Sequence, residues 1–143
     1  MSDLDPYDLE RFIEAQAGGV YAQALSELRT GRKTSHWIWF IFPQVLGLGR
    51  SAIAEIYAIR SAAEGQAYAT HPVLGPRLHE MTEVVADSPV PAAQMFGEVD
   101  AMKLRSSMTL FEVVSGNQEL FTQVLDAKFD GERCQQTLDF LRV

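Results

Sequence analysis

The stretch that decides the fold is KTSHWIWFIFPQ, residues 33–44, followed closely by GLGRS at residues 47–51. It holds both tryptophans of the chain, Trp37 and Trp39, and no other window has comparable aromatic mass. Burying one large aromatic side chain removes roughly 150–250 Å² from water, which contributes about 4–6 kcal/mol before entropy is subtracted. We therefore expect this stretch to be the centre of the core, with its polar residues lining a pocket.

The segments around this stretch repeat apolar residues at helical spacing, and most of them start or stop at a capping residue or a glycine. Ser51 is a typical N-cap for a helix through Ile59, and Thr34 or Ser35 is the expected cap of a short helix through Phe40. The longer helices are expected near residues 6–17, 20–30, 61–70, 72–87, 99–115, 118–128 and 132–142.

A buried strand over the aromatic stretch is the alternative to a short helix. No other segment has the alternating, β-branched pattern that a partner strand would need. The sequence therefore predicts an all-α fold, in which residues 1–143 form a single compact helical domain of about seven to nine helices around the central aromatic segment.

Composition excludes several classes of function. The formal net charge of −7 disfavours binding to nucleic acid or to an anionic membrane, because both require clustered Lys and Arg. No apolar run is long enough for a signal peptide or a membrane span, so we expect a cytoplasmic protein. The single cysteine excludes an internal disulfide, and the three histidines lie on separate predicted elements. We expect no metal and no cofactor.

The predicted helix over residues 99–115 breaks its own apolar pattern. Asp100, Lys103, Ser106 and Ser107 fall inside the apolar arc of that helix. Polar groups in such positions are costly to bury unless each one finds a partner or a ligand. Two interpretations stay open: a structural Asp–Lys pair with serines bonded to helix carbonyls, or a ligand-binding face.

Several motifs together resemble a known family. They are HWxWFxFPQ at residues 36–44, GLG at 47–49, AYxxHPxLGxRL at 67–78, FG at 96–97 and TLF at 109–111, together with the four polar residues of the 99–115 helix. This set resembles the bacterial family catalogued as domain of unknown function 1810, over nearly the whole chain. The resemblance implies a mostly helical single domain with no established activity. Some members carry the name calpastatin, but this chain lacks the length, disorder and repeats of a calpain inhibitor.

A second resemblance concerns layout alone. The order of the blocks ExxAY at residues 64–68 and PxxGxR at 72–77, then a helix leading to Asn117 and a C-terminal helical pair, is similar to the NADAR family, which acts on ADP-ribose and related N-glycosides. An acidic residue in the first block works on the glycosidic carbon in that family, which implies this role for Glu64. The chain lacks the family's late Asp-x-x-Trp-Gly block, and the Ser61–Glu64 capping box also explains Glu64 structurally.

These observations lead to one working hypothesis, a pocket between residues 33–51 and the 99–115 helix that binds a nucleotide or an ADP-ribose-like small molecule. The expected catalytic residues, which would move protons, are His36, Glu64 and Asp100. The expected ligand-binding residues are Lys33, Trp37, Trp39, Gln44, Arg77, Lys103, Ser106 and Ser107. Whether the protein is an enzyme stays open. The alternative is a non-enzymatic adaptor or subunit that uses the aromatic segment as an interaction surface.

Overall fold

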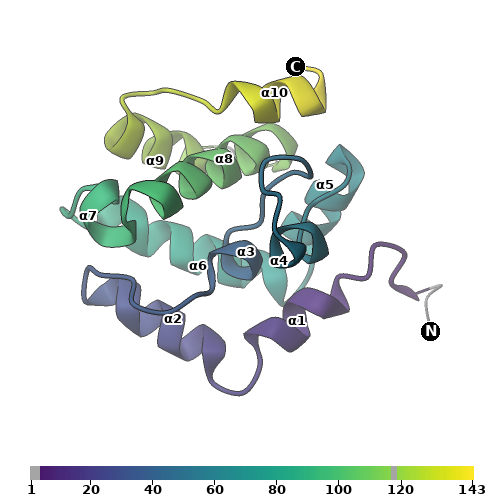
Figure 1. Ribbon diagram of the computed structural model, residues 1–143, viewed down its shortest axis with the longest axis horizontal. Helices are drawn as coiled ribbons and strands as arrows, with labels where there is room; N and C mark the ends of the chain where they lie inside the picture. Colours follow the sequence, from purple (N-terminus) through teal and green to yellow (C-terminus); the bar gives the residue numbers. More distant parts are fainter. Residues whose placement is uncertain (1–3, 117–118) are drawn as a thin grey trace.

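The computed structural model describes residues 4–116 and 119–143, and within these ranges it contains ten helices and no strand (Figure 1). The helices are α1 (Glu10–Gln16), α2 (Val20–Arg29), α3 (Ile38–Ile41), α4 (Ala52–Ile56), α5 (Ala62–Thr70), α6 (Leu74–Asp87), α7 (Ala92–Phe96), α8 (Glu98–Val114), α9 (Glu119–Phe129) and α10 (Gln135–Leu141). The all-α prediction is confirmed. The count is one above the expected seven to nine, since three short helices, α3, α4 and α7, form in addition to the seven longer ones.

The longest helix, α8, is the centre of the arrangement. It packs against α5, α7, α9 and α10, while α6 packs against α2, α5 and α9. Figure 1 shows α1 and α2 on one side of the molecule, α8 to α10 on the other, and α3 between them. Within the described residues, no helix has the length and apolar character needed to cross a membrane.

The aromatic stretch lies in the core, as expected. Trp37 is 1% exposed, and its ring packs with those of Phe42 and Phe96 at centroid distances of 6.3 and 6.2 Å. Trp39 is the exception, because it is only partly buried. Trp37 is therefore a core residue, whereas part of the Trp39 ring is accessible from the surface.

One of the predicted helix caps forms in the structure and another does not. The Ser51 hydroxyl accepts a hydrogen bond from the Ala54 amide at 3.2 Å, which confirms that cap. The prediction that Thr34 or Ser35 caps α3 is wrong, because α3 begins at Ile38 without a side-chain cap. The backbone amides of Thr34 and Ser35 instead donate to the carboxylate of Glu27.

The predicted starts of α1 and α10 and the predicted end of α4 also need correction, and α10 begins at Gln135 rather than near residue 132. Helix α1 begins at Glu10 rather than near residue 6, although the carboxylate of Asp5 still accepts hydrogen bonds from the first amides at Leu9 and Glu10. Helix α4 ends at Ile56 and does not reach Ile59. The reason is that Ile59 forms an isolated parallel bridge with Val45, a pairing that helical periodicity does not reveal. Asn117 and the expected first residue of the 118–128 helix lie outside the described residues.

Candidate functional site

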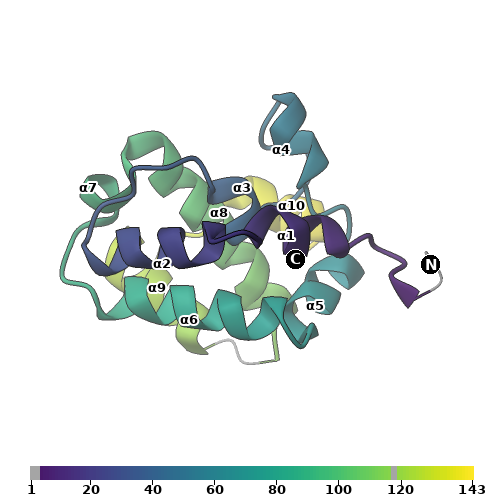
Figure 2. The same cartoon turned by 90° about the horizontal axis from the view of Figure 1, so that it is seen from below.

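A closed surface loop forms most of the candidate site. The Ile59 amide donates to the carbonyl of Gln44 at 2.8 Å, and the Leu46 amide donates to the carbonyl of Ile59 at 2.9 Å. These bonds bring the two ends of segment 45–59 together, as in an Ω-loop. Helix α4 lies within this segment, has no buried residue, and stands away from the other helices in Figure 2. The segment is therefore fixed at its base and open to solvent at its tip.

The base of this loop is tied down by one arginine of α1. The guanidinium group of Arg11 donates to the carbonyls of Ile56 and Ala58, at 2.8 and 2.9 Å. It also forms an ion pair with Glu64 at 2.6 Å, and the side chain of Glu64 is only 4% exposed. This network holds the end of α4 against α1 and α5, and thereby positions Tyr57.

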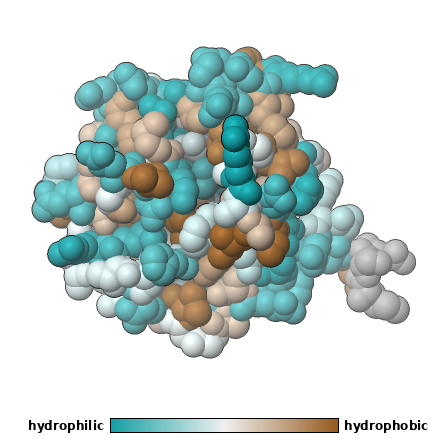
Figure 3. Space-filling model, viewed as in Figure 1, coloured by the Kyte–Doolittle hydropathy of each residue, from teal (hydrophilic) through white to brown (hydrophobic). Residues whose placement is uncertain are grey.

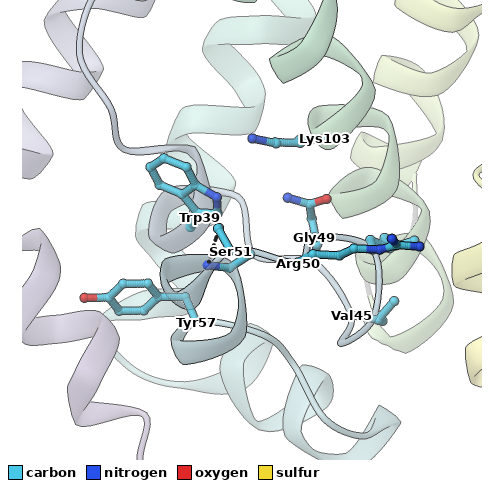
Figure 4. A pocket seen from close by; sticks show the side chains of 10 residues that line it. Trp39, Val45, Gly49, Arg50, Ser51, Tyr57 and Lys103 are labelled. Carbon is cyan, nitrogen blue, oxygen red and sulfur yellow. Dashed lines mark hydrogen bonds between the residues drawn. The ribbon is translucent and has the colours of Figure 1, made fainter.

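Between this loop, α3 and α8 lies a pocket of about 230 Å³. Its lining residues are Trp39, Gln44, Val45, Leu48, Gly49, Arg50, Ser51, Ala54, Tyr57 and Lys103 (Figure 4). Figure 3 shows the same face of the molecule, mostly hydrophilic, with a hydrophobic patch near its centre over α4. The pocket thus combines apolar walls with several polar groups.

Every polar side chain of the pocket can donate a hydrogen bond, and two of these side chains are cations. The ammonium group of Lys103 lies 5.0 Å from the centroid of the Trp39 ring, and Figure 4 shows it pointing across the pocket toward that ring. Arg50 extends away from Trp39 at the rim. In residues 4–116 and 119–143, no hydrogen bond or ion pair involves the side chain of Gln44 or Arg50. The pocket therefore presents positive charge and free donors, and its lining contains no carboxylate.

Asp100 stands just behind Lys103 and links it to a second lysine. One carboxylate oxygen of Asp100 lies 3.4 Å from Lys103, and the other lies 2.7 Å from Lys33. Lys33 in turn lies 5.0 Å from the centroid of the Trp37 ring. Each tryptophan of the aromatic stretch thus has one lysine over its ring, and one aspartate joins the two lysines.

Glu27, which is not among the predicted site residues, shapes the start of the aromatic stretch. Its buried carboxylate accepts hydrogen bonds from the Gln23 side chain, the Thr34 amide, the amide and hydroxyl of Ser35, and the Trp37 indole. Burial acts to raise the pKa of Glu27, but these hydrogen bonds together hold that pKa well below its usual range. A signal was present, because Glu27 falls between Ala24 and Leu28 on the apolar face of the predicted 20–30 helix.

A model of one family matches residues 6–141, and that family is described as proteins of unknown function, DUF1810. The chain belongs to the DUF1810 family. Its structure is similar to the crystal structure of the conserved hypothetical protein Rv1873 from Mycobacterium tuberculosis, with a TM-score of 0.94 and 45% sequence identity. The similarity covers 97% of this chain and 99% of the mycobacterial chain. No curated protein matches this chain.

In this DUF1810 protein, several predicted site residues are brought together. Trp39, Gln44 and Lys103 line the pocket, and Asp100 contacts Lys103 from outside it. Lys33 and Trp37 lie behind the pocket, where the side chain of Lys33 is 6% exposed and Trp37 is buried. A hollow thus lies between the 45–59 loop, α3 and α8, and three of the predicted ligand-binding residues line it.

The other predicted residues lie elsewhere. We expected His36 in this pocket, but it is exposed and lines a different hollow beside Gly19 at the start of α2, because Glu27 holds the neighbouring residues of its loop against that helix. Glu64 lies beside Arg11 at a third hollow. Arg77 donates to the side chain of Gln16 at 3.1 Å and packs over a tyrosine ring.

The two serines of the 99–115 helix are buried within α8. The Ser106 hydroxyl donates to the carbonyl of Met102 at 3.1 Å, which matches the structural alternative of a serine bonded to its own helix. The Ser107 hydroxyl has no hydrogen-bond partner among the described residues. Nor do those residues contain a group of three or more His, Cys, Asp or Glu side chains that could hold a metal ion.

Proposed function

We propose that this DUF1810 protein binds a small anionic molecule that carries a planar ring, such as a nucleotide-derived metabolite, in the pocket between the 45–59 loop and α8. The observation that carries the proposal is the placement of Lys103 across the pocket from Trp39. The indole ring offers a stacking surface, and the ammonium group offers a partner for phosphate or carboxylate.

The charge of the pocket supports an anionic ligand. Lys103 and Arg50 contribute two cations to the lining, and no lining residue is acidic. The whole chain has a formal net charge of −7, so this positive lining is unusual for the molecule. Cations and donors around a stacking ring, of which Gln44 and Arg50 have no side-chain partner among the described residues, match an anion joined to a ring.

The size of the pocket limits what fits inside it. Pockets that hold drug-sized ligands usually enclose about 300–1,000 Å³, and this one encloses about 230 Å³. A mononucleotide, which carries one base and one phosphate, is a better match than a larger molecule. A longer molecule such as ADP-ribose would have to leave part of its length outside the pocket, along the exposed loop.

Binding is better supported than glycoside chemistry. A general acid or base must reach the reacting bond directly or through one water. His36, Glu64 and Asp100, the three candidates for proton transfer, do not line the pocket. The adaptor alternative requires exposed tryptophans, and the burial of Trp37 to 1% exposure favours the pocket over that alternative.

Calorimetric titration with phosphate, adenosine, adenosine monophosphate and ADP-ribose tests the proposal. We expect adenosine monophosphate to bind more tightly than phosphate or adenosine alone. Lys103→Met should weaken binding about tenfold or more, because a charge-assisted hydrogen bond contributes about 1.5–3 kcal/mol. The matched control is Arg29→Met, which removes one positive charge from an exposed side chain outside the pocket.

Three results would contradict the proposal. The first is the absence of binding by all four compounds. The second is equal weakening by Lys103→Met and by the Arg29→Met control, which would indicate attraction by overall charge. The third is self-association of the protein that depends on Trp39 and leaves its affinity for all four compounds undetectable, as the adaptor alternative predicts.

A further inference from the structure

The proposed function uses Lys103 but leaves Asp100 and Lys33 unexplained. Asp100 divides its carboxylate between two lysines, and the two contacts are unequal. The contact to Lys33, at 2.7 Å, has the length of a charge-assisted hydrogen bond, which is about 2.7–2.9 Å. The contact to Lys103, at 3.4 Å, is longer than such a bond. Lys33 is therefore the close partner of Asp100, and Lys103 is the loosely held one.

We infer that Lys33 and Asp100 are positioning residues that keep Lys103 available to the ligand. This inference rests on the proposed function. Lys33 neutralises most of the charge of Asp100, so Asp100 steadies Lys103 without capturing it. Lys103 stays over the Trp39 ring, and its ammonium group is free to move to an anion that enters the pocket.

Burial explains why the two lysines have different roles. The side chain of Lys33 is 6% exposed and lies over the buried ring of Trp37, so it has little freedom to leave Asp100. The side chain of Lys103 is 27% exposed and lies over the partly buried ring of Trp39. The cation–π contact between a lysine and a solvent-exposed ring is weak. Moving Lys103 to a ligand therefore disturbs little else.

Removing Lys33 should reverse this arrangement. In the variant Lys33→Met, Asp100 loses its close partner, and Lys103 is its one remaining ion-pair partner among the described residues. Lys103 should then move onto Asp100 and away from Trp39, which neutralises the charge that the pocket needs. Replacing Asp100 with asparagine in the same chain removes the competing anion and should release Lys103 again.

Titration of these variants with adenosine monophosphate tests the inference. Lys33→Met should weaken binding at least about fivefold, and Lys33→Met combined with Asp100→Asn should restore it to within about twofold of the wild type. Arg32→Met removes the neighbouring positive charge from an exposed residue and should leave the affinity within about twofold. If Lys33→Met does not fold, Lys33→Gln replaces it with the same expectations.

The inference is overturned if Lys33→Met binds like the wild type, if Arg32→Met weakens binding as much as Lys33→Met, or if the double variant shows no recovery. Equal weakening would indicate general electrostatic attraction. Absence of recovery would indicate a purely structural role for Lys33.

A measurement on the ligand-free protein separates this inference from the proposed function. The Cε methylene protons of Lys103, next to its ammonium group, should show an upfield ring-current shift in the NMR spectrum, because that ammonium group lies over the Trp39 ring. The shift should disappear in Trp39→Leu, decrease in Lys33→Met, and be unchanged in Arg32→Met. If the wild type binds none of the compounds but these shifts behave as expected, the proposed function fails and the positioning network stands. An unchanged shift in Lys33→Met would overturn the network itself.

Discussion

The indole nitrogen of Trp37 donates a hydrogen bond to the buried carboxylate of Glu27 at 3.0 Å. This contact joins the largest side chain of the core to the residue that fixes the loop before it. Because Trp37 is 1% exposed and Glu27 is 4% exposed, neither partner can turn to water if the other is removed. The pair therefore supports both the core and the path of the chain toward the pocket.

Replacing Glu27 with glutamine should destabilise the protein by about 3 kcal/mol, because one amide oxygen cannot accept the donors that two carboxylate oxygens accept. The measurement is urea unfolding followed by circular dichroism. Glu14→Gln is the matched control, since Glu14 is exposed, and it should be close to neutral. Equal stability of the two variants would contradict the role assigned to Glu27.

Stability should fall at acidic pH because of Glu27 and Glu112. Burial acts to raise the pKa of Glu112, but hydrogen bonds from Arg133 and Thr122 lower it overall, and the pKa of Glu27 is lowered in the same sense. The unfolded chain takes up protons near the ordinary value of 4.5, while the folded chain resists them. The free energy of unfolding should therefore be constant above this value and decrease below it. Urea unfolding between about pH 6 and pH 3 should show a shallower decrease for Glu27→Gln than for the wild type.

Arg11→Met should cost about 3–5 kcal/mol, because it leaves the carboxylate of Glu64 buried without its ion-pair partner. Arg11→Lys should recover only part of the loss, since one ammonium group cannot reach the five oxygens that the guanidinium group contacts. Adding Glu64→Gln to Arg11→Met should restore some stability, as thermal unfolding of the double variant would reveal. A double variant that is less stable than Arg11→Met would contradict this account.

The two tryptophans should differ in their effect on stability. Trp37→Ala should cost about 3–5 kcal/mol, the usual result of emptying a large aromatic site in a packed core. Trp39→Ala should cost less than half of that, because Trp39 is partly exposed in the wall of the pocket. Chemical unfolding of both variants measures the difference. Equal losses would show that Trp39 is as much a core residue as Trp37.

Gly49→Ala should distort the pocket with little effect on stability. A Cβ atom at Gly49 would lie 2.6 Å from the Cβ atom of Ala54, so the loop and α4 would have to separate. We expect weaker binding of adenosine monophosphate, but a nearly unchanged unfolding midpoint because α4 has no buried residue. At Gly116, an added Cβ atom would meet no atom of the described residues within 4 Å, so Gly116→Ala is the matched control. Unchanged affinity in Gly49→Ala would argue that the pocket is not the binding site.

The helices could be predicted from the sequence because their signals are local. Apolar spacing and the caps at Ser51 and Ser61 depend on residues three or four positions apart. The end of α4 could not be predicted in this way. It depends on the pairing of Val45 with Ile59 and on the hydrogen bonds from Arg11, which connect distant parts of the chain.

The site could be predicted only in part, for the same reason. Lys103 could be predicted because it interrupts an apolar helix face. Trp39 and Gln44 could be predicted because they lie in the aromatic stretch. Arg50 and Tyr57 join the pocket through the path of the loop, which no periodic pattern encodes. His36 was misplaced because the direction of its side chain depends on the long-range bonds of Glu27 to the neighbouring residues.

The bridge between Val45 and Ile59 has a consequence for how such a protein can change over evolutionary time. The loop leaves the core at one residue and returns beside it at the other, and α4 between them contributes no buried side chain. Loops closed in this way tolerate changes of length and composition far better than packed helices do. Proteins with this fold can therefore change the sequence and length of the loop, and with it the ligand, while the helices beneath the loop keep their packing.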